Sequence, residues 1–487
     1  MTDVDPFALV LLIASLVGLA AVLSSRLGAW IPIPAPALFL VGAAVASDIW
    51  PRLGEVPVGL VERVVTVALV IILFDGGMQI GWRSLRTTAG PIVWIGVVGT
   101  VCTAAALAAC AHFVFGLDWR LALLLGTALS PTDPAVVFSV LGRREITGRS
   151  GVLLQGESGA NDPVGIALMV VLLGSTTFHA SAVASAVGVF TTQMLVGAAV
   201  GGLGGAALLW FMRRIPLPAA GLYSVRVLMC ALAIYGLATL AHGSGFLAVL
   251  VAGVVLGDRR APFKAEIVRF HSALANLAEI VAFIMLGLTI QLTGGEGIAG
   301  GGAWVIGLGL AVLLAFVIRP VVMGALLWRV DLTAGERWFV LWTGLKGAVP
   351  ILLGTFIIDA GVSGAHRTYE IIFVVVAFSV IVQGAAVPFL ARRLGVPVRE
   401  VNPRPWGLGV RFEHEPVGLH RLTVAADSEA DGMAVADLPS GAWVSVIIRR
   451  GHMVPVTAEV TLRAGDEVLL QADPEAAERD IVALFTR

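Results

Sequence analysis

The sequence predicts an all-α polytopic membrane protein with a small α+β domain at its C-terminal end. Of the 487 residues, 58% are hydrophobic and 13% are charged, which is about half the charged fraction of a typical soluble protein. Apolar runs of about 20 residues, the length that crosses a bilayer core, recur through most of the chain. The final part differs, because residues 1–399 hold 24 basic and 19 acidic side chains whereas residues 400–487 hold 8 and 14.

This change in composition marks the expected domain boundaries. We expect a transmembrane domain over residues 1–398, a proline-containing linker over residues 399–415 and a C-terminal domain over residues 416–487. The start of the chain has no basic segment and no small-residue cleavage site, so the first apolar run is expected to stay as a span rather than act as a signal peptide. The three cysteines lie in apolar runs without the spacing of a metal site or a disulfide framework.

The transmembrane domain is predicted to cross the membrane about thirteen times. The predicted spans are residues 7–25, 32–49, 59–80, 91–115, 120–141, 156–174, 187–212, 225–241, 245–257, 272–292, 302–328, 338–360 and 369–390. The connections on one side hold 17 basic side chains and those on the other side hold 4. Because basic loops stay in the cytoplasm, this pattern places the N-terminus outside a cytoplasmic (inner) membrane and the C-terminal domain in the cytoplasm.

The fifth and twelfth predicted spans are interrupted by helix-breaking residues. Residues 130–134 read SPTDP and residues 344–350 read GLKGAVP. Proline and glycine release backbone amides and carbonyls, which membrane depth tolerates only where they are buried in protein or line a cavity. The two spans run in opposite directions, so the paired breaks predict inverted repeats whose crossing helices form a binding site. Two ordinary proline kinks are the alternative, although each break also carries a charge.

Charged side chains inside the spans are the first candidates for function. One such residue at the centre of a membrane helix costs about 2.5–3.5 kcal/mol on insertion scales and therefore needs a partner or a function. The selected candidates are Asp75, Asp133, Glu157, Asp162, Arg319 and Lys346.

Asp162 and Asn161 form a candidate site for a monovalent cation. A carboxylate beside an amide offers oxygen ligands that can replace the water around Na⁺ or K⁺. The same carboxylate, removed from water, is also stabilised by binding a proton. One group that holds either a cation or a proton, but not both, is the minimum requirement for exchange. The alternative is a structural role at a helix start, because Pro163 would suit the first turn.

Asp133 lies between Thr132 and Pro134 in the first interruption. Its carboxylate can cap the free amides of a crossing helix or provide oxygens to the ion, and the sequence leaves both roles open. Thr132 can contribute its hydroxyl and carbonyl oxygens. Lys346 in the second interruption is expected to balance the charges of the opposed helix ends.

Glu157 and Arg319 are expected to form a buried, structural ion pair, because each removes the cost of burying the other. Asp75 is either a second proton-linked acid at the mouth of the cavity or a polar residue in a helix contact. The sequence favours neither role.

A short motif also suggests a different chemistry. The stretch GESG resembles a motif of intramembrane serine proteases, with Ser158 as nucleophile and His242 as base. Such a dyad needs both side chains within hydrogen-bond reach. His242 falls at the end of a span, and a protease leaves Asp133 and Asp162 unexplained, so this alternative ranks last.

The order of the motifs resembles that of the cation/proton antiporter family of the NhaP and sodium/proton exchanger type. The matching stretches are LFDGGM, SPTDPAVVFSVL, GESGANDPVG, FLAVLVAGVVLG and GLKGAVPI, and the resemblance covers about residues 7–395. It implies that Asp162 is the transporting carboxylate. The residues implied to assist it in holding K⁺ or Na⁺ are Asn161, Ser158, Asp133 and Thr132.

The same resemblance implies that Glu157 and Arg319 are the family's buried ion pair and that Asp75 is an acidic position on the third span. An asparagine–aspartate pair goes with electroneutral, one-for-one exchange. A six-helix core domain is expected to slide against a dimerisation domain in a homodimer. The family usually has arginine where this chain has Lys346. Lysine, unlike arginine, can release its proton when buried, which leaves electroneutrality open.

The C-terminal domain resembles the C-terminal subdomain (RCK_C, or TrkA-C) of regulators of potassium transport, through DGMAVADLP, VSVIIRRGHMVPV and LRAGDEVLL. We expect strands at residues 418–426, 443–449 and 467–471, a hairpin turn at Gly451, a short helix at 433–438 and a helix at 474–485. No GxGxxG motif follows a strand there, so we expect no dinucleotide-binding half. The resemblance implies dimerisation and a small regulatory ligand, a nucleotide such as cyclic-di-AMP, and a packing module without a ligand is the alternative.

Together these features predict an antiporter, and not an enzyme, that exchanges K⁺ or Na⁺ for H⁺ and serves pH homeostasis. The expected partners are the lipid bilayer, a second copy of the chain and the regulatory nucleotide, with no nucleic acid and no resident cofactor. A cation channel gated by the C-terminal domain is the main alternative, but no TVGYG-like filter sequence occurs.

Overall fold

The computed structural model describes two compact units, Met1–Pro403 and Arg404–Arg487. The described ranges are residues 34–81, 94–141, 144–146, 149–174, 180–259, 261–290, 302–328, 330–400 and 418–472 without 427, 440, 450 and 451, together with Leu19, Gly90, Ile92, Leu292 and residues 483–485.

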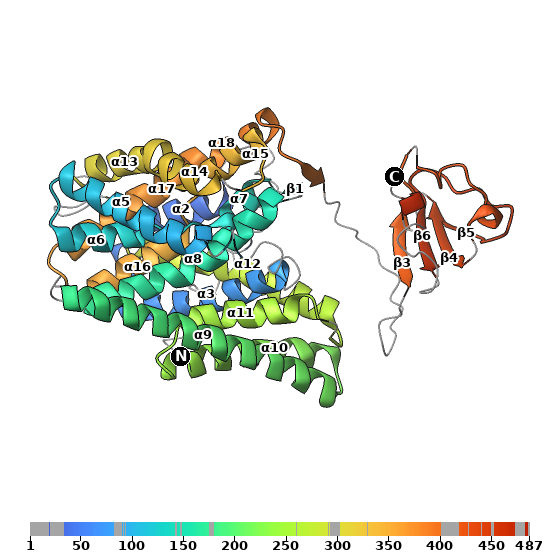
Figure 1. The fold of residues 1–487 in the computed structure, drawn as a ribbon, viewed down its shortest axis with the longest axis horizontal. Helices are drawn as coiled ribbons and strands as arrows, with labels where there is room; N and C mark the ends of the chain where they lie inside the picture. Colours follow the sequence, from blue (N-terminus) through green and yellow to red (C-terminus); the bar gives the residue numbers. More distant parts are fainter. Residues whose placement is uncertain are drawn as a thin grey trace, which may run out of the picture. The chain divides into compact units, whose positions relative to one another are not determined.

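The first unit is a bundle of helices (Figure 1). They are α2 (Ala35–Ile49), the 3₁₀ turn η1 (Pro51–Leu53), α3 (Val58–Ile80), the π-helical turn η2 (Trp94–Gly99), α5 (Thr100–Phe113), α6 (Trp119–Ala128), α7 (Pro134–Leu141), α8 (Arg149–Gly174), α9 (Ala180–Arg214), α10 (Ala220–Leu240), α11 (Gly245–Gly257), α12 (Lys264–Leu288), α13 (Ala303–Leu313), the π-helical turn η3 (Leu314–Ile318), α14 (Arg319–Leu327), α15 (Ala334–Trp342), α16 (Ala348–Asp359), α17 (Ala365–Phe378), the π-helical turn η4 (Ser379–Gln383) and α18 (Gly384–Arg393).

These helices confirm the predicted all-α membrane fold. The second to the thirteenth predicted spans all coincide with them, whereas the first lies outside the described residues apart from Leu19, which is helical. Six of the described helices, counted across their π-helical turns, are long and apolar enough to cross a membrane. Shorter apolar helices include α6 and α16, which are short because each is one half of an interrupted span.

Three helices begin well before their predicted spans. α8 begins at Arg149 instead of residue 156, α9 begins at Ala180 instead of residue 187, and α12 begins at Lys264 instead of residue 272. The first two turns of each helix carry polar or basic residues, so the hydropathy of the sequence marks only the apolar part. Asp162 therefore lies in the middle of α8.

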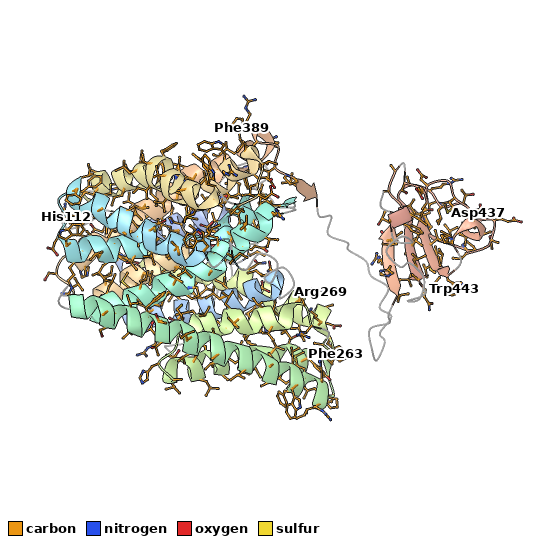
Figure 2. All side chains as sticks on the ribbon, viewed as in Figure 1. His112, Phe263, Arg269, Phe389, Asp437 and Trp443 are labelled. Carbon is orange, nitrogen blue, oxygen red and sulfur yellow. The ribbon has the colours of Figure 1, made fainter. Side chains whose placement is uncertain are left out.

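Side-chain caps fix several helix starts. Asp118 accepts a hydrogen bond from the Arg120 amide at the start of α6, at 2.9 Å. Thr333 and Glu336 form a capping box at the start of α15. Across the connection between α5 and α6, His112 in the last turn of α5 stacks on Trp119 at the start of α6, with ring centroids 4.1 Å apart, at the edge of the helical unit where His112 is labelled in Figure 2.

The helices pack as two groups. One group is α2, α3 and α9 to α12, and the other is α5, α6, α8 and α13 to α18. In Figure 1, α9, α10 and α11 lie on one side of the unit and α13, α14 and α17 on the other. The groups meet where α3, α9, α11 and α12 of the first group contact α8 or α16 of the second.

α3 and α11 approach each other more closely than any pair of larger residues would allow. A β-carbon at Gly77 would overlap the Leu250 carbonyl oxygen, and one at Gly253 would overlap the Phe74 carbonyl oxygen. Small residues permit this backbone contact, which is a common way for membrane helices to associate. Asp75 therefore lies on a helix that is fixed firmly to its neighbour.

A short two-stranded ladder joins the connection between α7 and α8 to the end of the first unit. β1 (Arg144–Ile146) pairs antiparallel with β2 (Val398–Glu400), with Arg144 opposite Glu400 and Ile146 opposite Val398. The strand β2 extends into the region that the sequence assigns to the linker.

The second unit contains an antiparallel sheet of four strands in the order β3-β6-β4-β5. The strands are β3 (Leu419–Thr423), β4 (Ala442–Arg449), β5 (His452–Val454) and β6 (Glu467–Ala472), and a 3₁₀ turn, η5 (Val435–Asp437), lies between β3 and β4. One buried cluster includes Ile447, Leu470 and Phe485, whereas Trp443 is exposed (Figure 2). The predicted strands and hairpin are present; the helix predicted at 474–485 lies outside the described residues except for 483–485.

Candidate functional site

The two predicted interruptions lie against each other in the first unit. The chain leaves helical conformation between α6 and α7 and again between α15 and α16. The backbone amide of Asp133 in the first break donates to the carbonyl of Leu345 in the second, at 2.8 Å. The predicted pair of broken, crossing helices is therefore confirmed.

Lys346 is buried between the breaks, with 1% of its surface exposed. Its Nζ donates to the carbonyls of Ser130 and Pro131, at 3.1 and 2.9 Å. These carbonyls follow the C-terminal end of α6, where helix dipoles favour a positive charge. The backbone amide of Lys346 donates to Ser379 Oγ at 3.0 Å. Lys346 thus satisfies backbone groups that the interruption has released.

Asp133 occupies the opposite, N-terminal helix ends. Its Oδ1 accepts a hydrogen bond from the Ala135 amide at 2.8 Å, which caps α7, and the amides of Val136 and Ala348 also interact with the carboxylate. Ala348 is the first residue of α16, so one carboxylate serves two helix starts. A β-carbon on Gly347 would overlap this carboxylate, which explains why glycine precedes α16.

α8 passes the crossing and carries the other candidates. Asp162 is 7% exposed and Asn161 is 2% exposed. Because α8 begins at Arg149, the alternative role of Asp162 as a helix-start residue is wrong. Pro163 lies inside the helix, where proline removes one helical hydrogen bond and releases a carbonyl in the preceding turn.

Asn161 connects α8 to the first interruption. Its Nδ2 donates to Thr132 Oγ1 at 2.6 Å. Its Oδ1 is buried and has no hydrogen-bond partner among the described residues. A buried amide oxygen without a donor is unfavourable, so this oxygen is suited to a cation.

Asp162 experiences charges from both interruptions. It interacts with Asp133, which has the same charge, and with Lys346, which has the opposite charge. No group of three or more histidine, cysteine or acidic side chains suited to a metal ion occurs within the part of the chain that the structure describes. The oxygens near Asp162 are instead a mixture of carboxylate, amide, hydroxyl and backbone carbonyl, a set that suits a weakly held monovalent cation.

The predicted pair of Glu157 and Arg319 is present and buried, with side chains 5% and 4% exposed. Arg319 Nη1 and Nη2 donate to the two carboxylate oxygens of Glu157 at 2.9 and 3.2 Å, and Nε donates to the Leu341 carbonyl at 2.9 Å. Arg319 directly follows the π-helical turn η3, and its guanidinium lies where a β-carbon on Gly344 would be. The geometry is that of a structural clamp between α8 and α14, and Thr132 Oγ1 lies 3.5 Å from the Glu157 carboxylate.

Asp75 lies on α3, apart from this cluster. Its Oδ1 accepts a hydrogen bond from Ser272 Oγ of α12 at 2.9 Å, and its Oδ2 accepts one from Gln79 Nε2 at 2.6 Å. The side chain is 4% exposed. These contacts match the helix-contact role that the sequence left open for Asp75.

The serine protease alternative finds no support in the geometry. Ser158 is buried one turn before Asp162 on α8, whereas His242 is exposed in the turn after α10. No hydrogen bond joins them among the residues described.

Glu279 on α12 is a further, partly buried acid that is not among the residues predicted from the sequence. Its Oε1 is buried without a hydrogen-bond partner among the described residues, and its carboxylate interacts with that of Asp133. The sequence does contain an indication of this residue, because Glu279 is the single acidic residue in the apolar span 272–292.

Comparisons with known proteins agree with this architecture. Residues 10–393 match the family described as sodium/hydrogen exchanger, transmembrane, and residues 419–482 match the TrkA-C domain. The chain is similar to the K(+)/H(+) antiporter NhaP of Alkalimonas amylolytica, with 32% identity over 467 residues, which is 93% of this chain and 78% of that protein. It is also similar to the K(+)/H(+) antiporter NhaP2 of Shewanella sp. (strain MR-4), with 30% identity over 489 residues, 98% of this chain and 83% of that protein.

A solved structure shows the same fold. The sodium proton antiporter MjNhaP1 from Methanocaldococcus jannaschii matches 79% of this chain and 99% of its own, with a TM-score of 0.64 and 22% sequence identity.

Proposed function

The chain belongs to the sodium/hydrogen exchanger family, and we propose that it exchanges K⁺ for H⁺ through Asp162. It is a membrane protein and a cation/proton antiporter. The two antiporter relatives described above exchange K⁺ according to their names, which favours K⁺ over Na⁺ as the transported cation. These relatives are transporters, in agreement with a function other than that of an enzyme.

One observation supports this assignment most strongly. Asp162 is buried beside Asn161, whose Oδ1 has no partner in the part of the chain described here. Both lie against the first interruption, whose backbone carbonyls accept hydrogen bonds from Lys346. A bare carboxylate in such a place is unfavourable, so Asp162 is stable with either a proton or a dehydrated cation.

Exchange follows from this competition. A cation on Asp162 would use oxygens of Asn161, Thr132 and Ser158, with Asp133 as a further charge, and a proton on Asp162 would release it. Because one site alternates between two singly charged ions, the exchange is one-for-one and electroneutral as long as Lys346 keeps its proton.

Alternating access requires a movement between the two helix groups. Asp162, on α8, lies in the group of α5, α6, α8 and α13 to α18, next to the boundary with α3, α11 and α12. Sliding of the first of these groups past the other would move the site across the membrane, and a homodimer would hold the second group still. Asp75 at this boundary would then be a second proton-linked acid.

We place the protein in the cytoplasmic (inner) membrane, with the N-terminus outside and the TrkA-C domain in the cytoplasm, from the charges of its connections. The domain boundaries 1–398, 399–415 and 416–487 remain those predicted from composition. The C-terminal domain would regulate exchange by binding a small nucleotide such as cyclic-di-AMP, and the exchange itself would serve pH homeostasis.

The proposal is tested in everted membrane vesicles that carry a pH gradient reported by a fluorescent dye. Addition of K⁺ should dissipate the gradient without a net current, and Na⁺ and Li⁺ should act more weakly. Asp162→Asn should reduce the rate at least about 100-fold, whereas Asp331→Asn, a change in the exposed turn before α15, should leave it unchanged. A K⁺ current that persists in Asp162→Asn would instead indicate a channel, and equal exchange in both variants would disprove the role of Asp162.

A further inference from the structure

Glu279 lies at the boundary between the two helix groups. Its helix, α12, belongs with α2, α3 and α11 but also contacts α16 of the other group. α16 begins at Ala348, whose amide interacts with Asp133. Glu279 lies close enough to Asp133, across the boundary, for the two like charges to repel each other.

The surroundings of Glu279 leave its charge without compensation. One helical turn away, Ala275, Ala282 and Phe283 offer no donor, and Asn276 is exposed. Its Oε1 is buried without a hydrogen-bond partner among the described residues. A buried carboxylate in this condition is costly unless another charge approaches it.

The charged groups of the crossing already have other roles. Arg319 is bound to Glu157, Lys346 donates to backbone carbonyls, and Asp133 is stabilised by the starts of two helices. A charge on Glu279 is therefore left to be balanced by a mobile ion, either a proton or the transported cation.

Resting on the proposed exchange, we infer that Glu279 is a further cation-binding carboxylate, on which K⁺ is held opposite Asp133 before it reaches Asp162. The site is therefore shared between the two helix groups. One carboxylate belongs to the group that carries Asp162, and the other belongs to the group past which it slides. Ser272, two turns earlier on the same face of α12, binds Asp75 of α3, so this face of α12 carries a second polar position.

The test compares Glu279→Gln with Glu266→Gln, a matched change in the first turn of the same helix. In vesicles, Glu279→Gln should raise the KM for K⁺ at least about fivefold and leave the maximal rate within a factor of two. Glu266→Gln should change neither value. In the purified protein, the K⁺ concentration that half-maximally raises Tm should increase by the same factor in Glu279→Gln.

An unchanged KM in a well-folded Glu279→Gln protein would disprove the inference, and so would a loss of maximal rate at unchanged KM. Glu279→Asp keeps the charge, so its KM for K⁺ and its half-maximal K⁺ concentration for raising Tm should lie closer to those of wild type. It replaces the glutamine variant in the test if that variant is unstable. If wild type itself shows no K⁺-driven exchange, the proposed function fails rather than the role of Glu279.

The β1–β2 ladder carries a second, independent inference. β1 lies in the connection between α7, which Asp133 caps, and α8, which carries Asp162. β2 is the last described element before the TrkA-C domain. We infer that the C-terminal domain regulates transport by opening and closing this ladder. Opening of the ladder would then free the connection between α7 and α8, the helices next to Asp133 and Asp162.

Replacing residues 398–400 by three glycines should open the ladder permanently. This variant should change the KM for K⁺ by the same factor as removal of residues 404–487, and the two changes together should add nothing. Three glycines at residues 405–407 are the control and should behave as wild type. A glycine variant with wild-type behaviour, alongside an effect of removing the domain, would disprove the coupling.

A disulfide provides the converse test and does not depend on the glycine variant. Glu145 and Arg399 are opposite each other in the ladder, so Glu145→Cys with Arg399→Cys, in a chain without its three native cysteines, should close it. With the disulfide formed, removal of residues 404–487 should no longer alter exchange, and reduction should restore the difference. A persistent effect of removal in the oxidised protein would contradict the inference.

Discussion

The backbone amide of Asp133 donates to the carbonyl of Leu345 at 2.8 Å, although the two residues lie more than 200 positions apart in the chain. This bond joins the two interruptions directly, main chain to main chain. Lys346 adds a second connection, to Ser130 and Pro131. Main-chain and side-chain hydrogen bonds therefore hold the two interruptions together, and Asn161 of α8 is bonded to the first of them through Thr132.

Gly347 packs so closely against Asp133 that a side chain at this position would overlap the carboxylate. We expect Gly347→Ala to reduce K⁺/H⁺ exchange at least about tenfold, because the added methyl group overlaps the Asp133 carboxylate. Overpacking of this kind typically destabilises a protein by about 1–3 kcal/mol. The measurement is the exchange rate in vesicles, together with Tm of the purified protein. Gly42→Ala on α2, where nothing lies within 4 Å of the added carbon, should leave both unchanged.

Lys346 provides a test of the charge balance. We expect Lys346→Met to abolish exchange and lower Tm, since it leaves two buried carbonyls without their donor. Lys346→Arg keeps the charge that the family usually has there and should retain exchange. Both wild type and Lys346→Arg should transport without current on a supported membrane. A current in wild type that disappears in Lys346→Arg would show that Lys346 itself releases a proton during the cycle.

The ion pair of Glu157 and Arg319 should matter for stability more than for chemistry. Arg319→Ala leaves a buried carboxylate alone and is expected to destabilise the protein by about 3–5 kcal/mol, seen as a lower Tm in detergent. Replacing both residues, as Glu157→Gln with Arg319→Gln, should destabilise it less. The exposed pair of Arg149 and Asp331 is the control, and Arg149→Ala should have no measurable effect.

The C-terminal domain has its own buried acid. Burial alone would raise the pKa of Asp466, but hydrogen bonds from the Arg449 guanidinium and the Arg463 amide hold that pKa below its usual range. The folded pKa is depressed, so this interaction stabilises the domain above the ordinary aspartate pKa and is lost as the pH falls through the folded value.

Hydrogen exchange in the full-length protein measures this effect. Amides of β4 and β6 should lose protection below about pH 4 in wild type. Asp466→Asn should have lower protection at pH 7 and little further change in acid. Equal protection of wild type and variant at pH 7 would contradict this account.

The sequence was sufficient to find most of the site because polar and helix-breaking residues stand out in apolar spans. Asp162, Asn161, Asp133 and Lys346 were selected on that basis, and they lie together. Capping of a crossing helix is one of the two roles that the sequence leaves open for Asp133, and its carboxylate lies at the starts of both α7 and α16.

The misplaced start of α8 and the omission of Glu279 have related causes. Hydropathy identifies the most apolar part of a helix, so residues 149–155 at the start of α8 are predicted to lie in a loop. The sequence around Glu279 resembles that of any helix with one acid, and its significance depends on Asp133, which reaches it only through the packing of α12 on α16.

The backbone contact between α3 and α11 has a mechanical consequence. Helices that touch through Gly77 and Gly253 cannot shear along each other without driving carbonyl oxygens into α-carbons. The two helices are therefore expected to move as one rigid element that carries Asp75. In the proposed sliding movement, the crossing helices would move past α3 and α11, which would stay fixed to each other.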